Sequence, residues 1–350
     1  MYQTFATIII PAVVVFITTF YSTRFLISYL FGAGIIAEDI NKAKPVKLAS
    51  SGGIGVAFGI VFGILLYIFG TTFIFKPVLD IDALMAVALS ISLITFVGFI
   101  DDINVKGEKV KSTDIMDIRQ GLKQWQKPIL TLVGALPLMA INAGTSTIIL
   151  PFIGTVGFGL LYPLLIIPLA VVFIPNAVNI LGGFDGLQPA MILVASGGLM
   201  IYSIVFGTGA SAYMGAFLAA MLFSAVLAFF PYNKYKARVI PGDSFTYAAG
   251  AGLAAIMIMG NAEAFGLIIF IPWIIEFFLH LRRKFKVRDL GIRQSDGTMK
   301  APYGKKIYSL CHLVMNLKKK PVETDVTLWL TVLEVLFVVL AFGLKIFGFL

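Results

Sequence analysis

The amino-acid sequence predicts an all-α polytopic membrane protein, and three observations support this prediction. Hydrophobic residues make up 59% of the 350-residue chain, charged residues make up only 13%, and the mean hydropathy is +0.96. Soluble domains contain about 45–50% apolar and about 25% charged residues. The apolar residues also gather in runs, and about 20 of them suffice for a helix to cross a bilayer. We therefore expect residues 1–350 to form one integral membrane domain, and we exclude the soluble globular classes.

Ten apolar runs follow one another along the chain, separated by polar connections. They lie near 5–31, 51–75, 83–100, 128–143, 158–178, 188–206, 211–230, 244–260, 263–281 and 326–348. The first run is too long for a signal peptide and has no small-residue cleavage pattern, so we expect a retained helix. Residues 144–158 are rich in Gly, Thr and Ile, and we expect a small hairpin there. About ten transmembrane helices place both termini on one side of the membrane.

Basic residues are distributed unevenly between the two sides. The alternate connections 32–50, 101–127, 231–243 and 282–325 hold 3, 6, 3 and 12 Lys and Arg residues, which is 24 of the 27 in the chain. Because cytoplasmic loops carry the excess of Lys and Arg, we expect these loops to be cytoplasmic and both termini to be external. The same bias explains the net charge of +9, so we do not expect nucleic-acid binding. Most polar residues lie in these loops, which favours an active site on the cytoplasmic face.

Three aspartates stand at the ends of predicted helices. Asp101 and Asp102 end the third run, and Asp243 opens the eighth in the sequence Gly-Asp-Ser. Ionised groups at membrane depth cost about 2.5–3.5 kcal/mol each on insertion scales, so they normally have a partner. The adjacent pair indicates either a site for a divalent metal or phosphate, or a solvated helix end. Asp243 is either a helix cap or a carboxylate that holds a metal beside a phosphate at the helix N-terminus.

Amides and glycines cluster after the fifth run, in the sequence PNAVNILGGFDG at 175–186. Asn176 and Asn179 are three residues apart, so they share one face of a helix. The glycines that follow, Gly183 among them, let the backbone turn and approach a ligand closely. A tight linker between two helices requires neither two amides nor Asp185. The cluster therefore favours a binding site.

The long basic loop and the scarcity of His and Cys limit the chemistry. Most charges of the loop at 282–306 suit a lipid-facing patch, while one or two suit a diphosphate, because Arg binds phosphates bidentately. The chain has one Cys and two His, His280 and His312, which are far apart in the sequence and for which we expect structural roles. Oxygen ligands then dominate, which favours Mg²⁺ or Mn²⁺ over Zn²⁺.

In combination, these motifs resemble those of the polyprenyl-phosphate N-acetylhexosamine-1-phosphate transferases. The resemblance rests on the Asp pair after the third run, on NAVNILGGFDGL at 176–187 and on GDSF at 242–245, and it extends over nearly the whole chain from SGG at 51–53. Within the family the chain is most similar to the eukaryotic and archaeal UDP-N-acetylglucosamine–dolichyl-phosphate branch. Two features indicate this branch: NILGG follows NAV, and a long polar insertion separates the last two runs. The last loop lacks the His cluster that is usual in the muramoyl-pentapeptide branch.

The resemblance implies a reaction at the membrane surface. N-acetylhexosamine-1-phosphate, with GlcNAc-1-phosphate as the first expectation, passes from a UDP-sugar to a polyprenyl phosphate of the dolichyl type, and UMP is released. This is the first membrane step of glycan assembly, as in N-glycosylation. The implied partners are UDP-N-acetylhexosamine, the polyprenyl or dolichyl phosphate lipid and the membrane; a homodimer stays open. The implied cofactor is Mg²⁺ or Mn²⁺, and in a prokaryote the location is the cell membrane.

The resemblance also implies roles for residues at matching positions. These are catalysis by Asp101, Asp102 and Lys127, metal binding by Asp243 and Asn179, and substrate binding by Asn176, Gly183, Asp185, Lys286 and Arg288. Lys109 and Lys111 compete with Lys127 for the acceptor phosphate, because the loop that carries them is longer than in the dolichyl branch. Two positions depart from the family pattern: Ile240 replaces an aromatic residue common near the uracil, and Gly182 replaces an Asp of bacterial members.

Other functions remain as alternatives. The first is the same reaction with another UDP-amino sugar, or with undecaprenyl phosphate in cell-wall synthesis. The second is a secondary transporter or lipid flippase, which would place charged sites near the bilayer midplane and show related halves. The acids here lie at helix ends and the halves show no similarity, so the sequence favours the enzyme.

Overall fold

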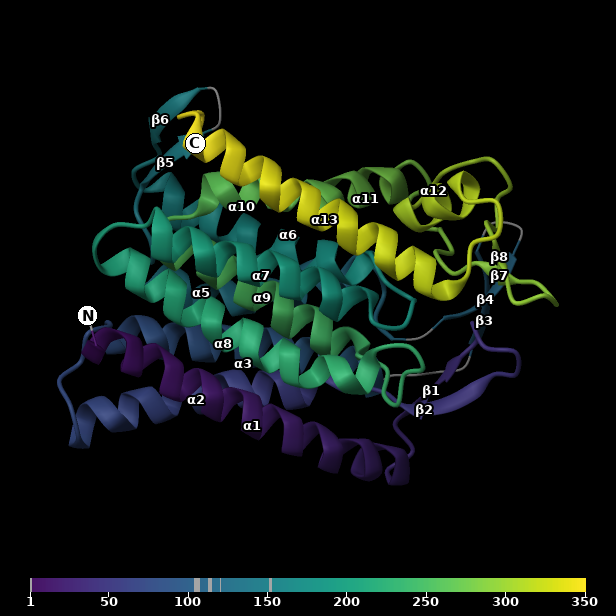
Figure 1. The fold of residues 1–350 in the computed structure, drawn as a ribbon, viewed down its shortest axis with the longest axis horizontal. Coiled ribbons are helices and arrows are strands. Elements are labelled where there is room, and N and C mark those ends of the chain that lie inside the picture. Colours follow the sequence, from purple (N-terminus) through teal and green to yellow (C-terminus); the bar gives the residue numbers. More distant parts are fainter. Residues whose placement is uncertain (1, 104–107, 113–114, 120, 151–152) are drawn as a thin grey trace.

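The computed structural model describes residues 2–103, 108–112, 115–119, 121–150 and 153–350, and its long helices run side by side in a bundle (Figure 1). Among these residues, seven helical segments are long and apolar enough to cross a membrane, or up to eight if one bent pair counts as a span. The seven are α1 (Tyr2–Gly32), α2 (Gly53–Phe73), α3 (Ile81–Ile103), α6 (Ile167–Ile180) with the π-helical turn before it, α7 (Leu187–Val205), α8 (Gly209–Asn233) and α13 (Glu323–Ile346). This arrangement confirms a polytopic helical membrane protein.

The remaining apolar runs take less regular forms. The run near 128–143 is divided into α4 (Gln126–Leu132), a 3-10 turn (Val133–Ala135) and α5 (Leu136–Ala140). The run near 263–281 forms α10 (Glu263–Ile269) and α11 (Ile271–Leu281), which meet at an angle of 58°. Pro272, at the start of α11, has no backbone N–H and interrupts the helix. The count of ten crossings therefore stays a prediction.

Helix α9 (Gly242–Met259) lies in the centre of the bundle, where small residues let its neighbours approach. Every residue from Ser244 to Ile258 is buried, which is typical of a helix packed on all sides. A Cβ atom on Gly98 of α3 would lie 2.5 Å from the carbonyl oxygen of Asp243, and one on Gly250 would lie 2.4 Å from Cα of Pro175 in α6. These contacts pack the end of α3 against the start of α9 and α6 against the middle of α9.

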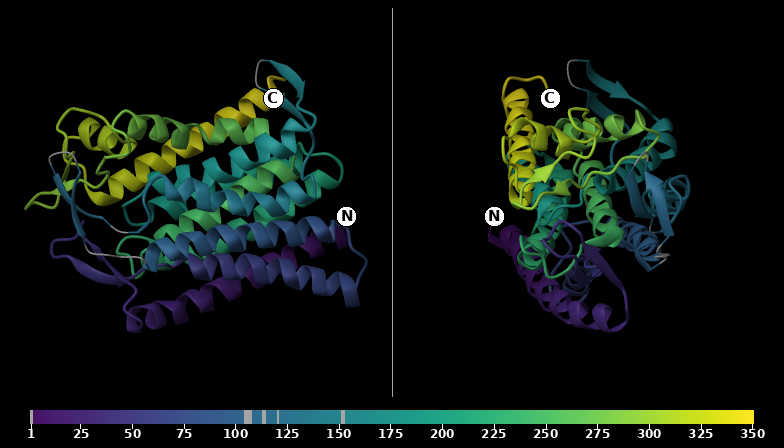
Figure 2. Two further views of the ribbon diagram at one scale, coloured as in Figure 1. Left: turned by 180° about the vertical axis from the view of Figure 1, so that it is seen from behind. Right: turned by 90° about the vertical axis from the view of Figure 1, so that its right-hand side faces the viewer.

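The two ends of the bundle differ. Both termini lie at one end, and the C-terminus is beside the hairpin of β5 (Thr147–Leu150) and β6 (Gly154–Gly157), which confirms the hairpin expected at 144–158 (Figure 1). The other end carries three further antiparallel hairpins and a short helix, and Figure 2 shows the same separation from behind. These elements are β1 (Ile36–Asp39) with β2 (Val46–Ala49), β3 (Glu108–Ser112) with β4 (Ile115–Arg119), β7 (Ile292–Arg293) with β8 (Met299–Lys300), and α12 (Leu310–Leu317).

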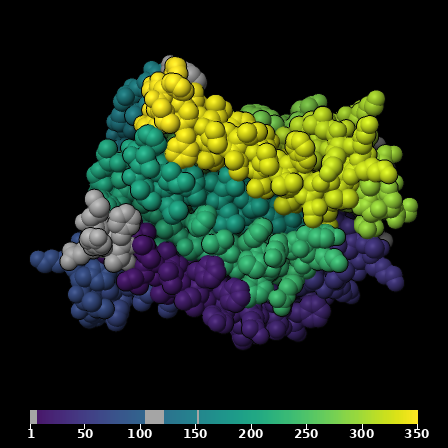
Figure 3. Space-filling model, in the orientation of Figure 1, coloured from purple at the N-terminus to yellow at the C-terminus, as the bar shows by residue number. Residues whose placement is uncertain are grey.

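The outer helices present apolar side chains to the surroundings. Phe25 in α1 is 67% exposed and Trp329 in α13 is 56% exposed, as expected of residues that face lipid. Figure 3 shows α13 lying across one face of the bundle from end to end. The hairpins and the loops that connect the long helices lie at the ends of the bundle (Figure 1).

Candidate active site

A cavity of about 770 Å³ lies at the end of the bundle that carries the three hairpins. Its wall is formed mainly by residues 36–41, 179–188, 240–243 and 287–290. The volume falls within the range of about 300–1,000 Å³ that is typical of small-molecule sites. Half of the predicted site residues line it, namely Asn179, Gly183, Asp185, Asp243 and Arg288.

A buried lysine joins two of the predicted carboxylates behind the cavity wall. Nζ of Lys127 lies 2.6 Å from Oδ2 of Asp101 and 2.7 Å from Oδ2 of Asp243. The side-chain amide of Asn179 donates to the same Asp243 oxygen over 2.8 Å, and Asp101 also accepts the backbone N–H of Leu122. The side chains of Lys127 and Asp101 are 12% and 5% exposed, whereas that of Asp243 is 22% exposed. Asp243 is thus the member of the ion pair that faces the cavity.

Asp102 caps helix α9 from a different helix. Its Oδ1 accepts the backbone N–H of Asp243 at 2.7 Å, and its Oδ2 accepts that of Ser244 at 3.1 Å and the hydroxyl of Ser51 at 2.8 Å. Gly242 leaves room for this carboxylate, since a Cβ atom there would lie 2.4 Å from Oδ2 of Asp102. The cap of α9 therefore comes from Asp102, and the side chain of Asp243 faces Lys127 instead.

Replacing Asp102 by alanine is expected to destabilise the protein. The variant leaves the first N–H groups of α9 without their acceptor, and a hydrogen bond to a charged group contributes roughly 1.5–3 kcal/mol. We expect a lower midpoint of thermal unfolding in detergent, together with reduced activity. Asp82→Ala, at the exposed opposite end of α3, is the matched control. An unchanged midpoint for Asp102→Ala would mean that the cap contributes nothing.

Asn176 lies behind the cavity wall and not in it. Its amide nitrogen donates to the hydroxyl of Thr131 at 3.1 Å and to the carbonyl of Val172 at 2.7 Å. The hydroxyl of Tyr247 donates to its amide oxygen at 3.1 Å. These contacts tie α6 to α4 and α9, so Asn176 supports the position of Lys127 and Asp243.

A second lysine, which sequence reasoning missed, holds the other side of the cavity. Nζ of Lys42 lies 2.8 Å from Asp39, 2.8 Å from Asp185 and 2.7 Å from Glu323. Burial alone would lower the pKa of Lys42, but the hydrogen bonds to the three carboxylates raise that pKa above its usual value. The ammonium group fills the space among the carboxylates, so this acidic cluster is an ion-pair network. No sequence pattern marks it, because its members come from three distant segments.

The remaining predicted residues lie on the basic loop and in β3. Arg288 lines the cavity, while Lys286, two residues earlier, is exposed and outside the wall. Lys109 and Lys111 are in β3, and their side chains are outside the described part of the chain. The structure therefore brings Lys127 to the predicted site.

The donor groups around Asp243 fit a hard divalent cation. Asp243, Asp101 and Asn179 offer carboxylate and amide oxygens, which are the ligands that Mg²⁺ and Mn²⁺ prefer. Among the described contacts of these side chains there is no His or Cys, which would favour Zn²⁺. Asp243 therefore offers such a carboxylate at the cavity wall, while Asp101 lies behind it and is bound to Lys127.

Comparisons with known proteins agree over most of the chain. Residues 84–261, from α3 to the end of α9, match the profile of glycosyl transferase family 4. The chain is 30% identical over 335 residues to a putative UDP-N-acetylglucosamine–dolichyl-phosphate N-acetylglucosaminephosphotransferase of Saccharolobus solfataricus, with 95% of each chain covered. It is 25% identical over 290 residues to the enzyme of that name from Dictyostelium discoideum, covering 73% of this chain and 67% of the relative. It is also 31% identical over 279 residues to the phospho-N-acetylmuramoyl-pentapeptide-transferase of Streptococcus mutans, with 77% of each covered.

Proposed function

The chain belongs to glycosyl transferase family 4, and from this premise we propose that it transfers GlcNAc-1-phosphate from UDP-GlcNAc to a dolichyl-type polyprenyl phosphate. The products are polyprenyl-diphosphate-GlcNAc and UMP. One observation carries the proposal: Asp243 belongs both to the wall of the cavity and to the buried ion pair with Lys127. A single carboxylate thus connects a nucleotide-sized cavity with a cation suited to a second phosphate.

The cavity receives the UDP-sugar in this proposal. Asp185 and Gly183 line the part assigned to the uridine, and Arg288 lines the part assigned to the diphosphate. Arg suits this role because its planar group forms two parallel hydrogen bonds with a phosphate. Lys286, which is exposed outside the wall, is assigned to reach the sugar or the diphosphate from the same loop. Lys127 holds the phosphate of the lipid acceptor on the other side of Asp243.

The reaction needs little base catalysis. A phosphate oxygen of the lipid attacks the β-phosphorus of UDP-GlcNAc, the bond from that phosphorus to the bridging oxygen breaks, and UMP leaves with the electron pair. A phosphate monoester has a second pKa of about 6, so the nucleophile is mostly dianionic at pH 7. Asp101 therefore serves first to hold Lys127, and Asp102 to hold the start of α9. Lys127 and Arg288 stabilise the charge on the transferred group.

A divalent metal, Mg²⁺ or Mn²⁺, completes this site. Asp243 would hold the ion with Asn179 as a second ligand or close neighbour, and the ion would neutralise charge that develops on the departing UMP. Asn179 then has two functions, since its amide nitrogen also orients the Asp243 carboxylate.

We also propose how the protein is oriented in the membrane. We assign ten crossings, with α9 and the divided segment 126–140 counted among them, within one transferase domain over 1–350. Both termini are external, and the end with the three hairpins is cytoplasmic, in the cell membrane of a prokaryote. The basic residues of these loops and the common end of both termini support this orientation (Figure 1).

Release of UMP tests the proposed function directly. Purified protein in detergent would receive Mg²⁺ and UDP-GlcNAc, with or without dolichyl or undecaprenyl phosphate. We expect UMP only when nucleotide sugar, lipid phosphate and metal are all present, and loss of the signal with a chelator. UMP only from a muramoyl-pentapeptide nucleotide would assign the substrate of the Streptococcus relative. No UMP from any UDP-sugar would overturn the enzyme proposal.

A further inference from the structure

Both histidines of the chain bind the segment that carries Arg288. Nε2 of His312, in α12, lies 2.9 Å from the carbonyl oxygen of Arg288, and Nε2 of His280, in α11, lies 2.8 Å from Oδ1 of Asp289. Residues 287–290 form one wall of the cavity. Two side chains from different helices thus hold adjacent residues of this wall.

The contacts of His312 define which of its nitrogens carries the hydrogen. The backbone N–H of Tyr308 donates to Nδ1 over 3.3 Å, so Nε2 carries the hydrogen that is donated to Arg288. Burial lowers the pKa of His312, which favours this neutral form. The N–H of Arg288 donates to the hydroxyl of Tyr303 at 3.1 Å. Side chains therefore bind both backbone polar groups of Arg288, although it lies outside regular secondary structure.

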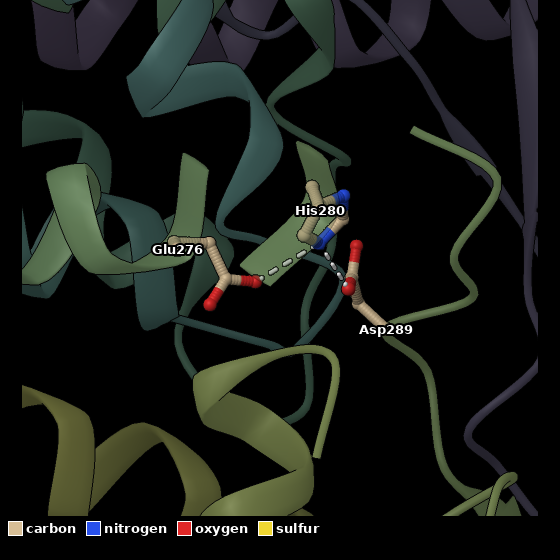
Figure 4. A group of neighbouring side chains, drawn as sticks. All are labelled: Glu276, His280 and Asp289. Carbon is tan, nitrogen blue, oxygen red and sulfur yellow. Dashed lines mark hydrogen bonds and ion pairs between the residues drawn. The ribbon is translucent and has the colours of Figure 1, made fainter. Parts of the chain in front are cut away.

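His280 lies between two carboxylates, as Figure 4 shows. Its Nε2 faces Oδ1 of Asp289 on one side and Oε1 of Glu276, 3.1 Å away, on the other. The second oxygen of Glu276, which is fully buried, accepts the N–H of Leu310 at 2.7 Å at the start of α12. Glu276 therefore binds both His280, which holds Asp289, and the start of the helix that carries His312.

Residues 288–290 pack against the part of the cavity wall that is assigned to the uridine. A Cβ atom on Gly183 would lie 2.6 Å from Cδ2 of Leu290, so the absence of a side chain at Gly183 admits Leu290. The carbonyl of Gly183 also accepts the amide of Asn41 at 2.7 Å. The position of residues 288–290 is thus coupled to the shape of the cavity.

We propose that His280 and His312 are positioning residues that hold Arg288 in place for the diphosphate of the nucleotide sugar. The inference rests on the function proposed above. Neither histidine contacts the substrate: His312 acts through the backbone of Arg288, and His280 acts through Asp289. A preordered segment loses less conformational entropy on binding than a mobile one does. Glu276 supports both histidines from the buried side.

Steady-state kinetics on single and double variants test this inference. His312→Ala and His280→Ala should each raise KM for UDP-GlcNAc by about 10-fold or more, as a misplaced binding group does, while KM for the lipid phosphate stays unchanged. In an Arg288→Ala background the same changes should add little, because the residue through which they act is absent. Asp289→Ala should likewise raise KM for UDP-GlcNAc. Asp289→Asn keeps an oxygen for His280, so its KM should stay close to that of the wild type.

The matched control is Asn316→Ala, in the same helix as His312. Asn316 is exposed, and its side chain donates to the carbonyl of Gly304 at 2.9 Å and not to residues 288–290. It should leave both KM values unchanged. Full additivity of His312→Ala and Arg288→Ala would overturn the inference, since a general loss of folding adds to any other defect.

Hydrogen exchange of the unliganded protein separates this inference from the proposed function. Amides of residues 288–291 should exchange about 10-fold faster in His312→Ala than in wild type or Asn316→Ala, because the opening of a local segment sets its exchange. Unchanged exchange would overturn the positioning role even if the enzyme is active. Absence of UMP release from wild type would overturn the proposed function, whatever the exchange shows.

Discussion

Asp243→Ala is expected to abolish UMP release, with a fall in kcat of at least about 10³-fold. Asp243 is the member of the ion pair with Lys127 that lines the cavity, and it is the carboxylate assigned to the metal. The fold should survive the change, because Asp102 caps α9 and Lys127 keeps its partner Asp101. The measurement is UMP release under saturating substrates, with membrane insertion and thermal unfolding checked in parallel.

Two further variants sharpen this prediction. Asp243→Asn keeps an acceptor for Asn179 but removes the charge, so its activity should be almost as low if the carboxylate binds a metal. Asp82→Asn removes an exposed carboxylate at the far end of α3 and should behave as wild type. Substantial turnover by Asp243→Ala would remove Asp243 from the metal site and leave it as a partner of Lys127 only.

The membrane helices could be predicted because each apolar run is a local signal. The central place of α9 could not, since it depends on the absence of side chains at Gly98 and Gly250, where α3 and α6 approach. The division of the run near 128–143 into short helices was also missed, because hydropathy was the signal used to predict it. Hydropathy records that a segment is apolar and not whether it continues as one helix.

The candidate site could also be predicted only in part from the sequence. The motifs identified Asp101, Asp243 and Asn179, and the structure brings them together at Lys127. Sequence reasoning did not find the network of Lys42, whose partner Glu323 is 281 residues away.

The roles of Asp102 and the two histidines also depend on tertiary contacts. Asp102 follows Asp101 directly, yet it caps a helix that begins about 140 residues later. His280 and His312 are far apart in the sequence, but adjacent residues of one cavity wall bind them both. A single sequence carries no signal for such contacts, because they arise only when the helices pack.

Lys127→Met is expected to have the second largest effect, because it removes the cation between Asp101 and Asp243. We expect a fall in kcat of about 10²–10³-fold and a higher KM for the lipid phosphate, since the acceptor loses its positive partner. The variant should also unfold at a lower temperature, because breaking a buried ion pair from one side costs about 3–5 kcal/mol. The measurements are UMP release at varied lipid phosphate and thermal unfolding in detergent.

A double variant separates the loss of catalysis from the loss of stability. Asp101→Asn combined with Lys127→Met removes one of the two facing carboxylates, so thermal stability should recover while activity does not. Lys109→Ala and Lys111→Ala test the two competitors and should keep the wild-type KM for the lipid phosphate. If the double variant regains activity along with stability, Lys127 has only a structural role. If Lys109→Ala or Lys111→Ala instead raises that KM, the acceptor phosphate is held by the loop that follows α3.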